Sequence, residues 1–106
     1  MLMLELPIPL RGLPTTNMEA YQLFLESKAL AAGEFYRILD AVEILERAVK
    51  LDPKFAEPHE LLANLYANII GSGRGTEKEY QPLLVNHANT ALRIDPKRVW
   101  AKAIKV

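Results

Sequence analysis

The sequence predicts an all-α domain built from antiparallel helix-turn-helix pairs, and three observations support this fold class. Apolar residues recur at three- and four-residue steps in four segments, which is the period of a helix with one buried face. Glycine or proline follows each segment, as is typical of helix ends. The ending Leu-Asp-Pro at 51–53 recurs as Ile-Asp-Pro at 94–96, which indicates that the helices repeat in pairs.

Composition and charge limit the functions that the chain can have. It has 106 residues, of which 50% are apolar and 25% charged, as expected for one small globular domain. Thirteen basic residues balance thirteen acidic ones, so we expect no binding to nucleic acid or to an anionic membrane surface. The absence of cysteine excludes disulfides and thiolate metal sites and allows a reducing compartment, so we expect a cytoplasmic protein.

The two ends differ from the middle of the chain. Leucines at positions 2, 4 and 6 alternate with other residues, and Pro7 and Pro9 disfavour a helix, so residues 1–16 are expected to form an extended arm. That stretch lacks a basic start and the roughly 20 apolar residues of a membrane span. Residues 97–106 begin a new amphipathic stretch, which predicts a truncated helix and a fragment of a larger protein.

The helical domain is expected to span residues 17–106, with two units at about 18–53 and 56–96. A capping box from Thr16 to Glu19 predicts where the first helix begins, with Thr16 as the cap. The four expected helices cover about residues 18–32, 38–51, 58–71 and 82–94.

The start of the fourth helix is open to two interpretations. Thr76 to Glu79 forms a second capping box, but Pro82 follows shortly after it. Either the helix begins at Thr76 and bends at the proline, or its first turn is irregular and the main helix begins near Pro82. We favour the second interpretation, because proline is tolerated best at the first helical position.

The two units resemble each other and a known family. Residues 46–53 read Glu-Arg-Ala-Val-Lys-Leu-Asp-Pro, and residues 89–96 read Asn-Thr-Ala-Leu-Arg-Ile-Asp-Pro. A helix pair that ends in proline resembles the tetratricopeptide repeat (TPR), a unit of about 34 residues, and a glycine-rich insertion at 71–79 accounts for the longer spacing here. The second unit matches the TPR consensus at Leu62, Ala63, Tyr66, Ala91 and Pro96 and departs from it at His59, Leu84 and Ala88.

This resemblance carries expectations for architecture and function. It implies an α-solenoid of about two and a half repeats, in which small residues let neighbouring helices approach closely. It also implies a non-catalytic module for protein-protein interaction. Residues 15–25, together with the glycine-rich insertion, are similar to TPR regions of bacterial signalling proteins, which follow nucleotidyl-cyclase or winged-helix output domains. The chain is therefore expected to be a regulatory fragment of such a protein.

A groove for a partner is a further implication of the resemblance. In TPR folds the first helix of each pair lines a concave surface, and its outward residues here are Phe24, Lys28, Glu60, Asn64 and Asn68. Asn64 and Asn68 are one helical turn apart, so both amides can pair with the backbone of an extended peptide; two solvated polar residues are the alternative. Lys28 is the single cation of this set. A clamp for a terminal carboxylate is not expected, because in TPR proteins it needs lysines and asparagines spread over three units, and Phe24 and the missing third unit break that pattern. We expect the partner to be a protein or peptide.

Self-association is the alternative function. Two units and a stub are fewer than the roughly three repeats that make such arrays stable alone. Phe24, Trp100 and the arm at 1–16 would then be buried at the face of a homodimer. The two functions do not exclude each other.

The residues that could carry chemistry predict no catalytic site. His59 and His87 are expected on different helices, each without a carboxylate one turn away, so a metal site is not expected. We expect His59 to be a partly buried ring, and His87 to lie either on a helix surface or packed between helices. The stretch 71–76 lacks the Gly-Lys-Ser/Thr ending of a phosphate loop. No serine has the acid-base companions of a nucleophile. We therefore expect no enzyme, no cofactor and no metal.

Overall fold

The computed structural model describes residues 15–33 and 37–98, and within them it contains four α-helices and no strand. The helices are α1 (Met18–Ala31), α2 (Ile38–Leu51), α3 (Ala56–Gly71) and α4 (Glu77–Ile94). The prediction of an all-α fold is confirmed. The expected arm, apart from its last two residues, and the expected truncated helix from residue 99 onward, including Trp100, lie outside the described residues.

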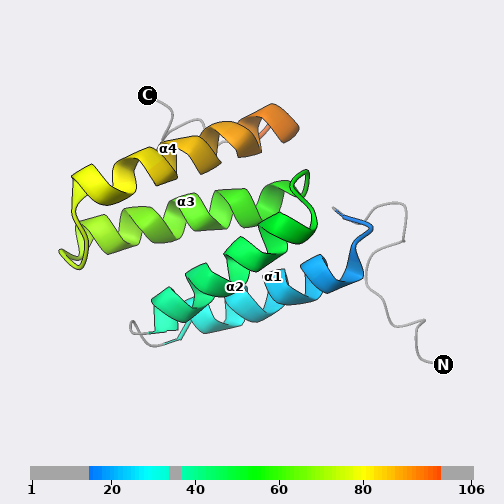
Figure 1. Ribbon diagram of the computed structural model, residues 1–106, viewed down its shortest axis with the longest axis horizontal. Coiled ribbons are helices and arrows are strands. Elements are labelled where there is room, and N and C mark those ends of the chain that lie inside the picture. Colours follow the sequence, from blue (N-terminus) through cyan, green and yellow to red (C-terminus); the bar gives the residue numbers. More distant parts are fainter. Residues whose placement is uncertain (1–14, 34–36, 99–106) are drawn as a thin grey trace.

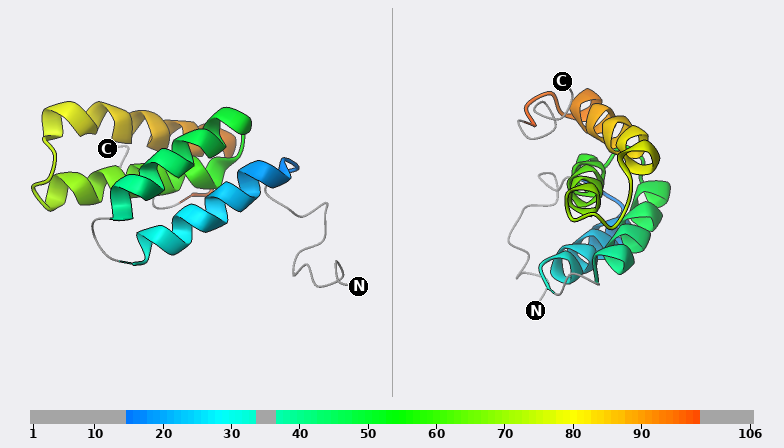
Figure 2. Two further views of the ribbon diagram at one scale, coloured as in Figure 1. Left: turned by 60° about the horizontal axis from the view of Figure 1, so that its bottom comes forward. Right: turned by 90° about the vertical axis from the view of Figure 1, so that its left-hand side faces the viewer.

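The helices pack as two antiparallel pairs (Figure 1). α1 lies along α2 and α3 lies along α4, while a smaller contact between α2 and α3 joins the pairs. Viewed end-on, α1 and α3 lie on one side of the molecule and α2 and α4 on the other (Figure 2). The first helices of the two pairs therefore share one face.

Asn17, rather than Thr16, caps the first helix. The side-chain oxygen of Asn17 accepts a hydrogen bond from the backbone N–H of Ala20 at 2.9 Å, as expected of an N-cap residue. The prediction of Thr16 as the cap was wrong by one position. Asn17 also donates from its amide nitrogen to the carbonyl of Leu51 at 3.3 Å, so this cap ties the start of α1 to the end of α2.

The fourth helix begins at Glu77, so the favoured interpretation of a start near Pro82 was wrong. The hydroxyl oxygen of Thr76 accepts the backbone N–H of Glu79 at 3.2 Å and caps the helix. Pro82 lies inside α4 on its exposed surface. Because proline lacks an N–H, it leaves only the carbonyl of Lys78 without its usual helical partner, and solvent can satisfy that carbonyl.

Small residues are among the most deeply buried side chains of the helices. Ala48, Ala63 and Ala91 are completely buried, as the sequence predicts for positions of close approach. Phe55, in the connection between α2 and α3, is also completely buried. Its ring centroid lies 5.3 Å from that of Phe24 on α1, so this aromatic contact joins the two helix pairs.

The connection between α3 and α4 requires glycine at two positions. Gly73 has a φ angle of 79°, in the left-handed region that side chains rarely adopt. A Cβ atom on Gly75 would lie 2.8 Å from the side chain of Ile69 and would overlap the ring of Tyr80. The glycine-rich insertion therefore includes a tight turn that packs against both helices of the second pair.

Candidate functional site

A cavity of about 330 Å³ opens between α1 and α3, on the face that these helices share. We call it the α1–α3 groove, and its lining residues are Phe24, Lys28, Glu57, Glu60, Leu61 and Asn64. Four of the five residues expected to face a partner therefore come together there. The fifth, Asn68, is exposed but does not line the cavity.

The apolar part of the groove is formed by Phe24 and Leu61. Phe24 is only 9% exposed, because its ring packs edge-on against Phe55. Lys28 follows Phe24 by one helical turn, which places its ammonium nitrogen 5.6 Å from the centre of the Phe24 ring. This cation-π contact holds a positive charge beside the apolar surface.

The α3 wall of the groove carries polar side chains at helical spacing. Glu57, Glu60 and Asn64 lie three and four residues apart, so they share one face of the helix. Arg98, in the turn after α4, binds both carboxylates: Nη2 lies 2.9 Å from Glu57 Oε2, and Nη1 lies 2.6 Å from Glu60 Oε1. Asp95 adds a longer contact to Nε at 3.5 Å.

The electrostatics around Arg98 follow from these contacts. Burial alone would lower the pKa of Arg98, but the carboxylates of Glu57, Glu60 and Asp95 outweigh that effect and raise it. The guanidinium group therefore stays charged and offsets part of the negative charge at this end of the groove. Sequence reasoning missed this role, because Arg98 and Glu60 are 38 residues apart and no local pattern links them.

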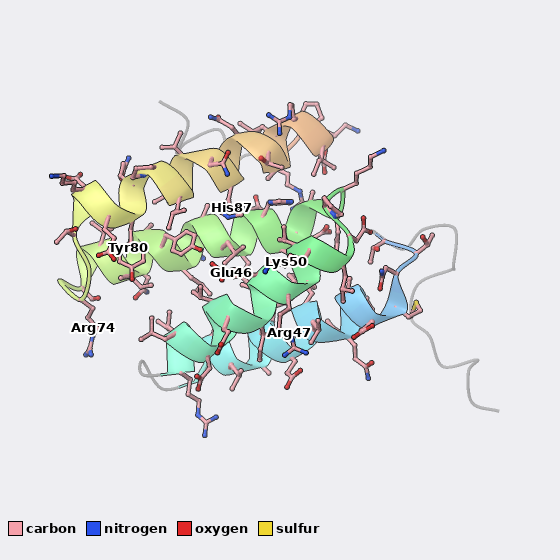
Figure 3. All side chains as sticks on the ribbon, viewed as in Figure 1. Glu46, Arg47, Lys50, Arg74, Tyr80 and His87 are labelled. Atoms are coloured by element: carbon pink, nitrogen blue, oxygen red, sulfur yellow. The ribbon has the colours of Figure 1, made fainter. Side chains whose placement is uncertain are left out.

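A second polar cluster lies between α2, α3 and α4. The Tyr66 hydroxyl donates to Glu46 Oε2 at 2.9 Å, and the Tyr66 ring lies 6.0 Å from that of His87. Figure 3 shows His87 and Tyr80 on α4 directed toward the part of α2 that carries Glu46. Burial raises the pKa of Tyr66, and the neighbouring Glu46 carboxylate raises it further.

The two histidines meet in this cluster. His59 is 5% exposed, in line with the expected buried ring, and its Nδ1 lies 3.0 Å from Nδ1 of His87. The sequence placed the rings on different helices but gave no sign that they touch, since 28 residues separate them. In the described part of the chain no group of three histidine, aspartate or glutamate side chains is placed to hold a metal ion.

Of the two side chains predicted for self-association, the structure describes one. Phe24 is mostly buried at the base of the groove, and Trp100 is not among the described residues. Several other large apolar side chains are exposed: Met18, Leu25, Leu39, Leu51, Leu83 and Ile94. None of the described helices combines the length and the apolar character needed to cross a membrane.

The chain was compared with known proteins at the levels of family, sequence and structure. No protein-family model, no curated protein and no solved structure matched it. The likeness to the TPR family therefore rests on the short motifs in the sequence, above all the repeated Asp-Pro ending.

Proposed function

We propose that the chain is a non-catalytic protein-interaction module that binds a segment of a partner protein in the α1–α3 groove. The observation that carries the proposal is the convergence of Phe24, Lys28, Glu60 and Asn64, from two helix pairs, on one cavity. Its volume of about 330 Å³ is at the lower end of the usual range for ligand pockets, about 300–1,000 Å³. That size suits an anchor side chain of a larger partner.

The chemistry of the groove defines the partner segment. Phe24 and Leu61 favour an aliphatic or aromatic side chain, because contact with them removes apolar surface from water. Lys28 at the edge favours a neighbouring acidic residue, and the Asn64 amide can pair with the partner's backbone. Arg98 already binds Glu57 and Glu60 and offsets part of their negative charge, so these carboxylates attract a basic segment less than unpaired ones would. The partner segment therefore carries an apolar residue beside an acidic one.

The proposal also covers the repeat family and the kind of protein to which the chain belongs. The repeated Asp-Pro ending and the packing of the helices in two pairs support a TPR-like array. The similarity of residues 15–25 to TPR regions supports a regulatory fragment of a cytoplasmic bacterial signalling protein. In such a protein the groove would receive another domain or a regulatory peptide.

A peptide selection tests the groove. A random-peptide display library is selected on the 106-residue chain, and the affinities of enriched peptides are measured for the unmodified chain, Lys28→Glu and Asn64→Ala. We expect peptides with adjacent apolar and acidic residues, an affinity about tenfold weaker for Lys28→Glu, and a smaller loss for Asn64→Ala. Lys78→Glu on α4 makes the same charge change outside the groove and should leave binding unaltered. Equal effects of the two lysine substitutions would contradict the assignment.

Self-association is a second candidate, favoured by the exposed apolar side chains on α1, α2 and α4, of which Leu39 is 61% exposed. Sedimentation equilibrium over a wide concentration range separates the two functions. A stable dimer would make self-association the main function. A folded monomer would leave the groove as the binding surface.

A further inference from the structure

The histidine pair between α3 and α4 has a fixed arrangement of protons. His59 Nε2 lies 2.9 Å from the carbonyl oxygen of Pro53, and because that oxygen can only accept, Nε2 must carry a hydrogen. A neutral His59 then has a lone pair on Nδ1. His87 must therefore donate from its own Nδ1 across the 3.0 Å contact. The backbone of Pro53 thus sets the tautomers of both rings.

Added protons affect this pair unequally. The first can be accepted by Nε2 of His87, which keeps the bond between the two Nδ1 atoms. The second would have to bind Nδ1 of His59, where an N–H would face another N–H at 3.0 Å. It would also place two positive rings with their centres 5.2 Å apart. The doubly protonated pair is therefore incompatible with the packed interface.

The groups around the pair add to this effect. From α2, Glu46 favours a positive charge on His87, while from α4, Arg93 disfavours one on His59. The Tyr66 ring on α3 lies 6.0 Å from that of His87 and brings no charge in neutral solution, because burial raises its pKa. Tyr80 on α4 packs against Tyr66, with the ring centroids 5.7 Å apart. Burial, followed by His59, lowers the pKa of His87 to about 4 despite Glu46. Burial also lowers the pKa of His59, although its hydrogen bond to Pro53 opposes the shift.

We propose that the His59–His87 pair is a proton-sensitive clasp that holds α4 on α3 in neutral solution and weakens that interface in mild acid. The pair is suited to this role because it lies between two helices and because its closed form has room for one bridging proton only. The proposal does not depend on the α1–α3 groove.

The direction of the pH effect follows from linkage between proton binding and opening. Histidines in an opened interface have the ordinary pKa of about 6.5. Above that pH neither state binds protons on these rings, so the interface keeps its full stability. As the pH falls from about 6.5 toward 4, the opened state binds up to two more protons than the closed state. Each of them favours opening by up to about tenfold per pH unit.

Nuclear magnetic resonance of the ¹⁵N-labelled 106-residue chain tests the arrangement directly. At about pH 7.5 we expect one ring with its hydrogen on Nδ1 and the other with its hydrogen on Nε2, and neither ring should titrate near 6.5 in the folded chain. Two rings that titrate near 6.5 while the fold is unchanged would overturn the proposal.

Amide hydrogen exchange and urea unfolding between about pH 7.5 and 5.5 test the consequence, in a range where most carboxylates stay ionised. Between about pH 7.5 and 5.5 the unfolding constant should rise by up to about 100-fold, with protection lost in α4 before α1. His87→Gln retains a neutral donor for His59 and should reduce the rise to about tenfold. His59→Gln with His87→Gln should abolish it. An equal rise in the double variant, or an equal loss of protection in α1 and α4, would overturn the proposal.

Discussion

The two polar faces of α3 differ in how their charges and hydrogen bonds are compensated. On the face toward α1, Glu57 and Glu60 share the single positive charge of Arg98 at an open groove. On the face toward α4, His59 is buried and satisfied only by the Pro53 carbonyl and by His87. Solvent can replace a lost partner at the first face but not at the second. We therefore expect substitutions between α3 and α4 to change stability, and substitutions in the groove to change binding.

The largest effect is expected from enlarging a small residue between α3 and α4. Ala91 is completely buried, so Ala91→Leu has no space for its side chain and should lower the free energy of unfolding by about 1–3 kcal/mol. Ala29→Leu makes the same change on the exposed surface of α1 and should shift it by less than about 0.5 kcal/mol. Urea denaturation measures both. Similar values for the two variants would show that Ala91 does not mark a close helix contact.

The sequence predicts features that depend on neighbouring residues better than features that depend on contacts between distant residues. The four helices were predicted because their apolar spacing is local, and the ends of α2 follow that spacing closely. The start of α4 was missed because the cap at Thr76 outweighs the cost of Pro82 at an exposed position. A capping motif can therefore mark the start of a helix even when a proline follows it within the first two turns.

The polar contacts of α3 could likewise be predicted only in part from the sequence. Asn64 and Glu60 were assigned to a groove from helical spacing and from the family resemblance, and both line the cavity. The partners His87 and Arg98 were not found, because each meets α3 only through the packing of α4 and the turn after it. A single sequence shows which residues share a helix face, but not which residue of another helix will lie opposite.

A moderate effect is expected from the hydroxyl that links α3 to α2. Tyr66→Phe keeps the buried ring but removes the bond to Glu46, so we expect a loss of about 0.5–1.5 kcal/mol in the free energy of unfolding. Tyr80→Phe keeps the ring 5.7 Å from Tyr66 and does not touch this bond, so it should cost less than about 0.5 kcal/mol. Thermal denaturation compares them. An unchanged melting temperature for Tyr66→Phe would mean that the face toward α2 tolerates the loss of a hydrogen-bond partner as well as the groove does.

The smallest effect on stability, with the clearest effect on binding, is expected at Arg98. Arg98→Ala leaves Glu57 and Glu60 at the groove without their cation, but water can solvate both carboxylates, so the free energy of unfolding should fall by about 1 kcal/mol or less. The groove becomes more acidic at that end, and peptides selected on the variant should gain basic residues and lose acidic ones. Arg98→Lys keeps the charge and should retain most of the original preference. A loss of stability as large as that of Ala91→Leu would contradict this expectation. It would show that Glu57 and Glu60 depend on Arg98 as strongly as the buried interface depends on its contacts, so the two faces of α3 would not differ.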